Sequence, residues 1–205
     1  MRKNSTELGA ASGNMPRLLL EARKREAKLV ERLRTLVEIE SPSGDKGAVD
    51  RAQTSFAAWA VVPGGKIRRH KHRDYGDSLE VHFDAGSSRM KPILLLGHLD
   101  AVWDHGTLAC MPWKVTRDVI AGPGVLDMKA GVMMALTAVE MLKDLQLLPR
   151  PITLLLHGDE EIRSPASRRI TEEVAKPATP STSLSLRRER WARTRQHARP
   201  SECTA

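Results

Sequence analysis

Three polar turns between Pro92 and Ser164 constrain the fold of this chain more than any other feature. The apolar run 93–96 leads into Gly-His-Leu-Asp at 97–100, and the run 152–156 leads into a turn that ends in three carboxylates. Between them, residues 122–131 form a glycine-rich acidic turn that opens a segment with helical periodicity. Short apolar runs without alternation are typical of buried parallel strands, and α/β folds place their chemistry at strand ends. The stretch therefore predicts an α/β domain with a polar site at one edge of its sheet.

Apolar periodicity and turn residues divide the rest of the chain into further elements. A helix is expected to start from a cap at Ser43 or Asp45, because both side chains can accept hydrogen bonds from a first helical turn. Together the expected elements predict a layered α/β domain with a mixed, mostly parallel sheet flanked by helices. The expected helices cover residues 17–40, 46–60, 129–145 and 164–175, and the expected strands cover 66–73, 79–83, 92–96 and 151–157, with a small hairpin at 115–120.

Composition and charge indicate where the domain boundaries lie and which partners to expect. We expect a disordered N-terminus at residues 1–16, a folded part at 17–175, and a basic tail at 176–205 that is disordered or read out of frame. The tail carries a net +5 of the total charge of +8, so the basicity does not belong to the folded part. It also lacks the motifs and interleaved aromatic side chains of nucleic-acid binders, so no nucleic-acid partner is predicted.

Targeting signals are not found in the sequence. The longest apolar run near the N-terminus is Leu18–Leu20, which is too short for the core of a signal peptide. No run approaches the length that crosses a membrane. We therefore predict a cytoplasmic protein with no membrane partner.

Histidine and carboxylate side chains at the three turns suggest a metal site. His98 and Asp100 are two residues apart and share one face of an extended chain, and a metal-bound imidazole commonly donates its other N–H to a carboxylate. Asp127 stands where a dinucleotide fingerprint needs its third glycine, which argues against a phosphate loop and allows a cation. In the run 159–161, adjacent carboxylates such as Glu160 and Glu161 can take different tasks at a metal. Taken singly, each motif is also compatible with a solvated turn or a structural histidine.

Taken in order, the motifs resemble a known family. Gly97–Trp103, Met111–Trp113, Gly122–Gly131, Asp159–Ile162 and Ser164–Arg168 closely resemble the co-catalytic zinc metallopeptidases that include glutamate carboxypeptidase, aminoacylase, acetylornithine deacetylase and succinyl-diaminopimelate desuccinylase. The bacterial glutamate carboxypeptidase branch is the most similar. The resemblance covers the N-terminal half of such a protein.

The resemblance implies a role for each motif residue. His98, Asp127 and Glu161 correspond to metal ligands, with Asp127 bridging two zinc ions just before a cis peptide bond. Asp100 corresponds to the residue that orients the histidine, and Glu160 to the general base. The implied activity is zinc-dependent, carboxypeptidase-like hydrolysis of amide bonds, which releases a C-terminal amino acid such as glutamate from a small peptide or an N-acyl substrate.

Several departures from the family pattern limit these implications. The branch usually has glycine where Arg163 stands and threonine where Ala101 stands. A further acidic ligand would fall near Ser185, and the family's last histidine ligand and its dimerisation domain lie downstream of this sequence. We therefore expect an incomplete zinc ligand set and an impaired fragment of unknown oligomeric state. A deacylase of the same family and a non-catalytic truncated product remain as alternatives.

Overall fold

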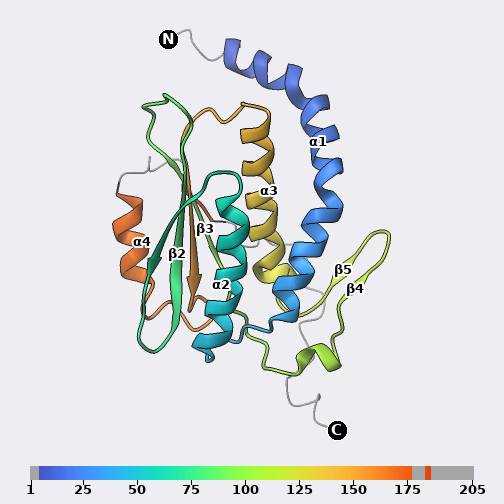
Figure 1. The fold of residues 1–205 in the computed structure, drawn as a ribbon, viewed down its shortest axis with the longest axis vertical. Coiled ribbons are helices and arrows are strands. Elements are labelled where there is room, and N and C mark those ends of the chain that lie inside the picture. Colours follow the sequence, from blue (N-terminus) through green and yellow to red (C-terminus); the bar gives the residue numbers. More distant parts are fainter. Residues whose placement is uncertain (1–4, 177–182, 186–205) are drawn as a thin grey trace.

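A five-stranded mixed sheet forms the centre of the computed structural model, which describes residues 5–176 and 183–185 (Figure 1). Strands β4 and β5 form a separate hairpin, as predicted for residues 115–120. The helices are α1 (Ser5–Glu38), α2 (Lys46–Val61), α3 (Ala130–Asp144) and α4 (Arg168–Ala175), and the strands are β1 (Lys66–His70), β2 (Gly76–Phe83), β3 (Ile93–His98), β4 (Lys114–Val115), β5 (Ile120–Ala121), β6 (Ile152–Gly158) and β7 (Ser183–Ser185).

The sheet has the order β1-β2-β6-β3-β7, and its pairing corrects one prediction. The pairs β1–β2 and β2–β6 are antiparallel, whereas β3–β6 and β3–β7 are parallel. The predicted mixed sheet is therefore confirmed, but a parallel majority is not found among the described strands. The reason is that the chain folds back between β1 and β2, so that β2 runs against β6.

Helices cover both faces of the sheet (Figure 1). The main core lies between the sheet and α1, α2 and α3, with Phe56, Phe83 and Leu136 among its fully buried side chains. A smaller cluster on the opposite face packs Leu94 and Leu155 against α4. Every residue of β6 is buried, as expected for a continuous apolar run at the centre of a sheet.

The N-terminal helix begins earlier than predicted. We expected disorder in residues 1–16, but the structure places residues 5–16 within α1, with Pro16 inside the helix. Leucine, alanine and methionine in this stretch favour helix even without an apolar stripe. For α2, Asp45 is the N-cap, since its Oδ1 accepts a hydrogen bond from the Ala48 amide at 3.0 Å.

Two predictions at the C-terminal end also need correction. Helix α4 begins at Arg168, four residues after the predicted start at Ser164: Ser164 has a φ of 54°, outside the helical region, and residues 165–167 form a turn before the helix. Residues 183–185 of the predicted disordered tail form β7, in a stretch where serine and leucine alternate as in a strand. The rest of the tail, residues 177–182 and 186–205, lies outside the described residues. In the part of the chain that is described, no helix is both long and apolar enough to cross a membrane.

Candidate metal centre

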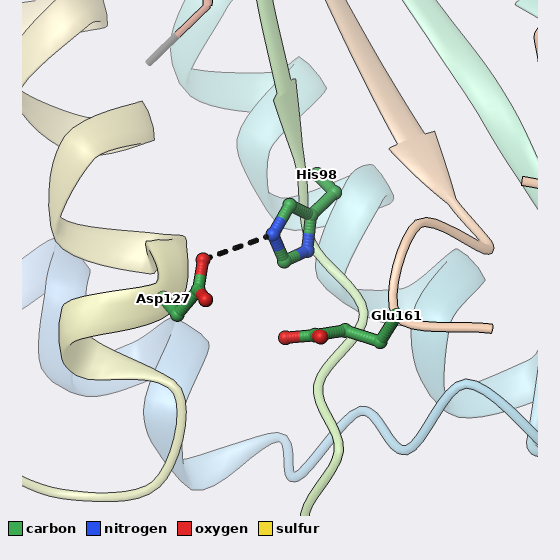
Figure 2. A group of neighbouring side chains, drawn as sticks. All are labelled: His98, Asp127 and Glu161. Carbon is green, nitrogen blue, oxygen red and sulfur yellow. Dashed lines mark hydrogen bonds and ion pairs between the residues drawn. The ribbon is translucent and has the colours of Figure 1, made fainter. Parts of the chain in front are cut away.

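Three of the residues singled out in the sequence lie together at one edge of the sheet. His98 is the last residue of β3, Asp127 belongs to a π-helical turn at Val125–Lys129 before α3, and Glu161 lies in the turn after β6. Figure 2 shows the carboxylates of Asp127 and Glu161 pointing toward the imidazole of His98. One potential ligand atom from each side chain lies within 4.8 Å of the other two.

The orientation of His98 is set by Asp100. The Nδ1 atom of His98 donates a hydrogen bond to the Asp100 carbonyl oxygen at 3.0 Å, and the Asp100 Oδ1 atom lies 3.3 Å from the same nitrogen. This arrangement places the proton on Nδ1. The other ring nitrogen, Nε2, lies 3.4 Å from Asp127 Oδ1 and is available to a metal ion.

Asp127 is held by the tight turn that precedes α3. Gly124 has a φ of 71°, a conformation that glycine adopts without strain, and its carbonyl oxygen accepts the Lys129 amide at 3.0 Å. The Asp127–Met128 peptide bond is cis, as the family resemblance implied. Lys129 is buried and its Nζ atom donates to the carbonyl oxygen of Leu36 at 2.8 Å, which ties this turn to the last turns of α1.

The acidic turn after β6 gives its three carboxylates different surroundings. Asp159 is completely buried, and its Oδ2 atom accepts the amides of Ala166 at 2.8 Å and Ser167 at 3.1 Å, so it shapes the turn. Glu160 extends toward the site, with its Oε2 atom 3.9 Å from His98 Nε2. The three adjacent carboxylates therefore differ in their surroundings, and the separate tasks predicted for Glu160 and Glu161 stay a prediction.

Negative charge is concentrated at this edge of the sheet. Burial raises the pKa of Glu161 to about 7, and the nearby carboxylates of Asp127 and Asp100 add to the shift. Burial alone would lower the pKa of His98, but hydrogen bonds with Asp100 and Asp127 outweigh it and raise the pKa to about 10. The shift of His98 reflects the carboxylates around it, which favour a positive charge at this position.

The donor set fits a divalent cation. One imidazole nitrogen and two carboxylates are the ligands that zinc accepts, and their ligand atoms are close enough to surround one ion. The remaining predicted residues, Asp100 and Glu160, lie beside this group without belonging to it. A cavity of about 200 Å³ adjoins the site and is lined in part by His98 and Glu160.

Sequence reasoning missed two buried residues that shape the site. Ser43 was considered only as a helix cap, yet its Oγ atom donates to Asp100 Oδ2 at 2.7 Å. Lys129 was placed at the start of a helix, and its burial was not foreseen. A lysine flanked by Met128 and Ala130 in the sequence was the only signal for its burial, and Ser43 gave no signal beyond a possible cap.

Comparison with known proteins identifies relatives of this chain. Residues 94–193 match the family described as Peptidase family M20/M25/M40, so the match extends past residue 175, where the resemblance seen in the sequence ended. The chain is 30% identical over 164 residues to carboxypeptidase G2 from Pseudomonas sp. (strain RS-16), a match that covers 78% of this chain and 39% of that protein.

Solved structures share the fold. Human carnosine dipeptidase 1 superposes with a TM-score of 0.68 at 19% identity, and the match covers 80% of this chain and 39% of that one. The M20 family metallo-carboxypeptidase Sso-CP2 from Sulfolobus solfataricus gives a TM-score of 0.61 at 19% identity, covering 76% of this chain and 37% of that one.

The fold and the site together define the class of this protein, an α/β domain with a candidate metal centre at one edge of its sheet. The chain belongs to peptidase family M20/M25/M40. It spans about 39% of the length of the carboxypeptidase that it matches.

Proposed function

We propose that this chain is the N-terminal part of the catalytic domain of a zinc-dependent hydrolase of amide bonds. The observation that supports the proposal is the convergence of His98, Asp127 and Glu161 at the sheet edge, with Glu160 beside them. The proposed folded part is residues 17–175. Bound zinc supplies a Lewis acid for the scissile carbonyl and lowers the pKa of a bound water.

Each side chain has a proposed task in this reaction. His98 offers Nε2 as a ligand because Asp100 holds the proton on Nδ1. Asp127 and Glu161 would hold the zinc together with His98, with Asp127 as the carboxylate shared between two ions, as the family resemblance implies. Glu160 is the general base, because it lies near the ligands but outside the donor group, where a carboxylate can accept a proton from water and pass it to the leaving amine.

The proposed substrate class is a small peptide or N-acyl amino acid, with release of a C-terminal residue such as glutamate. The 30% identity to a carboxypeptidase supports this choice. A deacylase uses the same motifs, so paired assays must separate the two: a dipeptide ending in glutamate tests the first activity, and an N-acetyl amino acid tests the second. The cytoplasmic location stays a prediction.

Within the described residues the group offers three donors, which is fewer than two complete zinc sites require. We therefore expect residues 1–205 by themselves to bind zinc weakly and to hydrolyse little of either substrate. Two tightly bound zinc ions per chain, with metal-dependent release of glutamate, would overturn this expectation of impairment and support the activity.

The deciding experiment is a zinc titration of the purified chain against a chromophoric chelator. The substitution Asp127→Asn should weaken binding by at least 10-fold, because it removes a charged donor from the centre of the group. The matched control is Asp74→Asn, since the Asp74 side chain is 76% exposed and is no member of the donor group. Equal zinc affinity in the unaltered chain and the Asp127→Asn variant would contradict the proposed function.

A further inference from the structure

The segment that follows α1 runs alongside the segment that follows β3. Pro42 and Ala101 form an isolated parallel bridge. The Ala101 amide donates to the Ser41 carbonyl oxygen at 2.9 Å, and the Ser43 amide donates to the Ala101 carbonyl oxygen at 3.2 Å. The Ser41 Oγ atom adds a bond of 2.6 Å to the carbonyl oxygen of Leu99. Residues 41–43 therefore hold the backbone on both sides of Asp100.

The side chain of Asp100 receives two further donors on one oxygen. Its Oδ2 atom accepts the Ser43 hydroxyl at 2.7 Å and the Glu161 amide at 3.0 Å, while its Oδ1 atom lies 3.3 Å from His98 Nδ1. The carboxylate is completely buried, and Ser43 is only 6% exposed. The orientation of the Asp100 carboxylate therefore fixes both the orientation of the His98 imidazole and the position of the Glu161 backbone amide.

Capping of α2 does not account for the buried hydroxyl of Ser43. Asp45 is the N-cap of that helix and accepts the Ala48 amide, so α2 begins without help from Ser43. The hydroxyl of Ser43 has two acceptors within reach, Asp100 Oδ2 at 2.7 Å and the Ala101 carbonyl oxygen at 3.4 Å, and the shorter contact is to the charged group. A hydrogen bond to a carboxylate is about twice as strong as one to a neutral acceptor.

We propose that Ser43 is a positioning residue of the metal centre, which acts through Asp100 on both His98 and Glu161. Removal of the Ser43 hydroxyl would break one of the two hydrogen bonds to Asp100 Oδ2 and leave the one from the Glu161 amide. The buried carboxylate of Asp100 would then be free to turn. As far as it concerns zinc, this inference rests on the proposed function. As far as it concerns Asp100 and Glu161, it depends on the geometry alone.

The test compares two variants that each lose one buried hydroxyl. Ser43→Ala removes the bond to Asp100 and keeps the backbone bridge. Thr153→Val is the control: Thr153 is 5% exposed, and its hydroxyl bonds to His82 Nδ1 at 3.0 Å near the start of β6, at the other end of the strand from the site. Two quantities are measured for each, the zinc dissociation constant by chelator competition and the hydrogen-exchange rate of the Glu161 amide by NMR in the metal-free chain.

Ser43→Ala is expected to raise the zinc dissociation constant about 10-fold and to speed exchange of the Glu161 amide by a similar factor. Thr153→Val should match the unaltered chain in both. If Ser43→Ala leaves the Glu161 exchange rate unchanged, or if both variants speed it equally, Ser43 has no positioning role. If the unaltered chain binds no zinc, the proposed function fails, and the amide exchange rate still decides the inference about Ser43.

Discussion

Asp100 and Asp159 are two completely buried aspartates just beyond the ends of neighbouring strands, yet they organise the chain in opposite ways. The hydrogen bonds of Asp100 reach Ser43 and Glu161, which lie 57 and 61 residues away in the sequence. Those of Asp159 reach Ala166 and Ser167, only 7 and 8 residues away. One aspartate joins three distant segments, whereas the other shapes a single turn.

The comparison distinguishes an aspartate that assembles the site, Asp100, from one that shapes a single turn, Asp159. Both carboxylates satisfy backbone amides, and burial makes each bond costly to lose. Only the bonds of Asp100, however, depend on the sheet, the α1–α2 connection and the acidic turn being in place together. We therefore expect substitutions at Asp100 to change metal binding and stability together, and substitutions around Asp159 to change stability almost alone.

The largest effect is expected for Asp100→Ala. The variant leaves the Nδ1 side of His98 without its buried counter-charge and frees the Glu161 amide, so unfolding free energy should fall by about 4 kcal/mol. Zinc affinity should fall about 100-fold. Urea unfolding and chelator competition measure the two quantities, with Asp100→Asn as a variant of the same shape. A loss of stability without any loss of zinc affinity would remove the distinction between the two aspartates.

The next effect is a pH dependence carried by His157, which lies on β6 just before Asp159. Its ring nitrogens bond to Ser78 Oγ at 3.0 Å and Thr171 Oγ1 at 2.7 Å. Burial lowers its pKa from 6.5 to about 4, although the charges of Asp159 and Asp100 oppose the shift. Because the unfolded chain binds the proton more readily, stability should fall as pH drops from 6.5 to 4, by roughly 3 kcal/mol.

Urea midpoints of the metal-free chain across this pH window measure the effect, and His157→Gln provides the comparison. The variant has no titrating group at this position. Its loss of stability between pH 6.5 and 4 should therefore be smaller than that of the unaltered chain by roughly 3 kcal/mol. Parallel curves for the two proteins would show that His157 does not contribute to the acid sensitivity.

Asp159→Ala should have an intermediate effect on stability alone. Two buried amides lose their acceptor, and unfolding free energy should fall by about 2 kcal/mol. Zinc affinity should change less than threefold, because neither amide belongs to the donor group. The same two assays apply, and a loss of zinc affinity as large as that of Asp100→Ala would show that local shape and site assembly cannot be separated here.

The smallest effect is expected to be stabilising. Arg163 has a φ of 77°, in the left-handed region that disfavours residues with a side chain, and its amide donates to the Glu160 carbonyl oxygen at 2.9 Å. Arg163→Gly should therefore raise the unfolding free energy by about 1 kcal/mol, as measured by a rise in melting temperature. The control is Arg168→Gly, at the first residue of α4, where glycine should destabilise by about 1 kcal/mol.

Much of the fold could be predicted from the sequence, because it depends on local patterns. The stripe around Leu33 and Leu36, the alternation from Leu79 to Phe83 and the run of β6 each carry a periodicity that burial requires, and the structure confirms these elements. Strand order and direction could not be obtained in this way. They depend on which distant segments pair, and no local pattern shows that β2 lies antiparallel beside β6.

The candidate site, like the fold, could be predicted from the sequence only in part. The polar turns after apolar runs predicted a polar site at one edge of the sheet, and the family resemblance implied His98, Asp127 and Glu161 as its ligands; the structure brings these three side chains together. The bond between Ser43 and Asp100 could not be predicted, because it crosses 57 residues and joins two loops whose neighbours are set only by the finished sheet. Their roles at a metal stay predictions.

The position of β6 between β2 and β3 has a consequence for synthesis of the chain. About 70 residues separate Phe83 from Ile152, its partner on β6, and at about 5–20 residues per second translation needs several seconds to cross that distance. During this interval the inner edges of β2 and β3 both await the strand that will lie between them. Once β3 has been made, the nascent protein therefore exposes two unsatisfied strand edges at once, which factors that shield emerging chains could cover until β6 arrives.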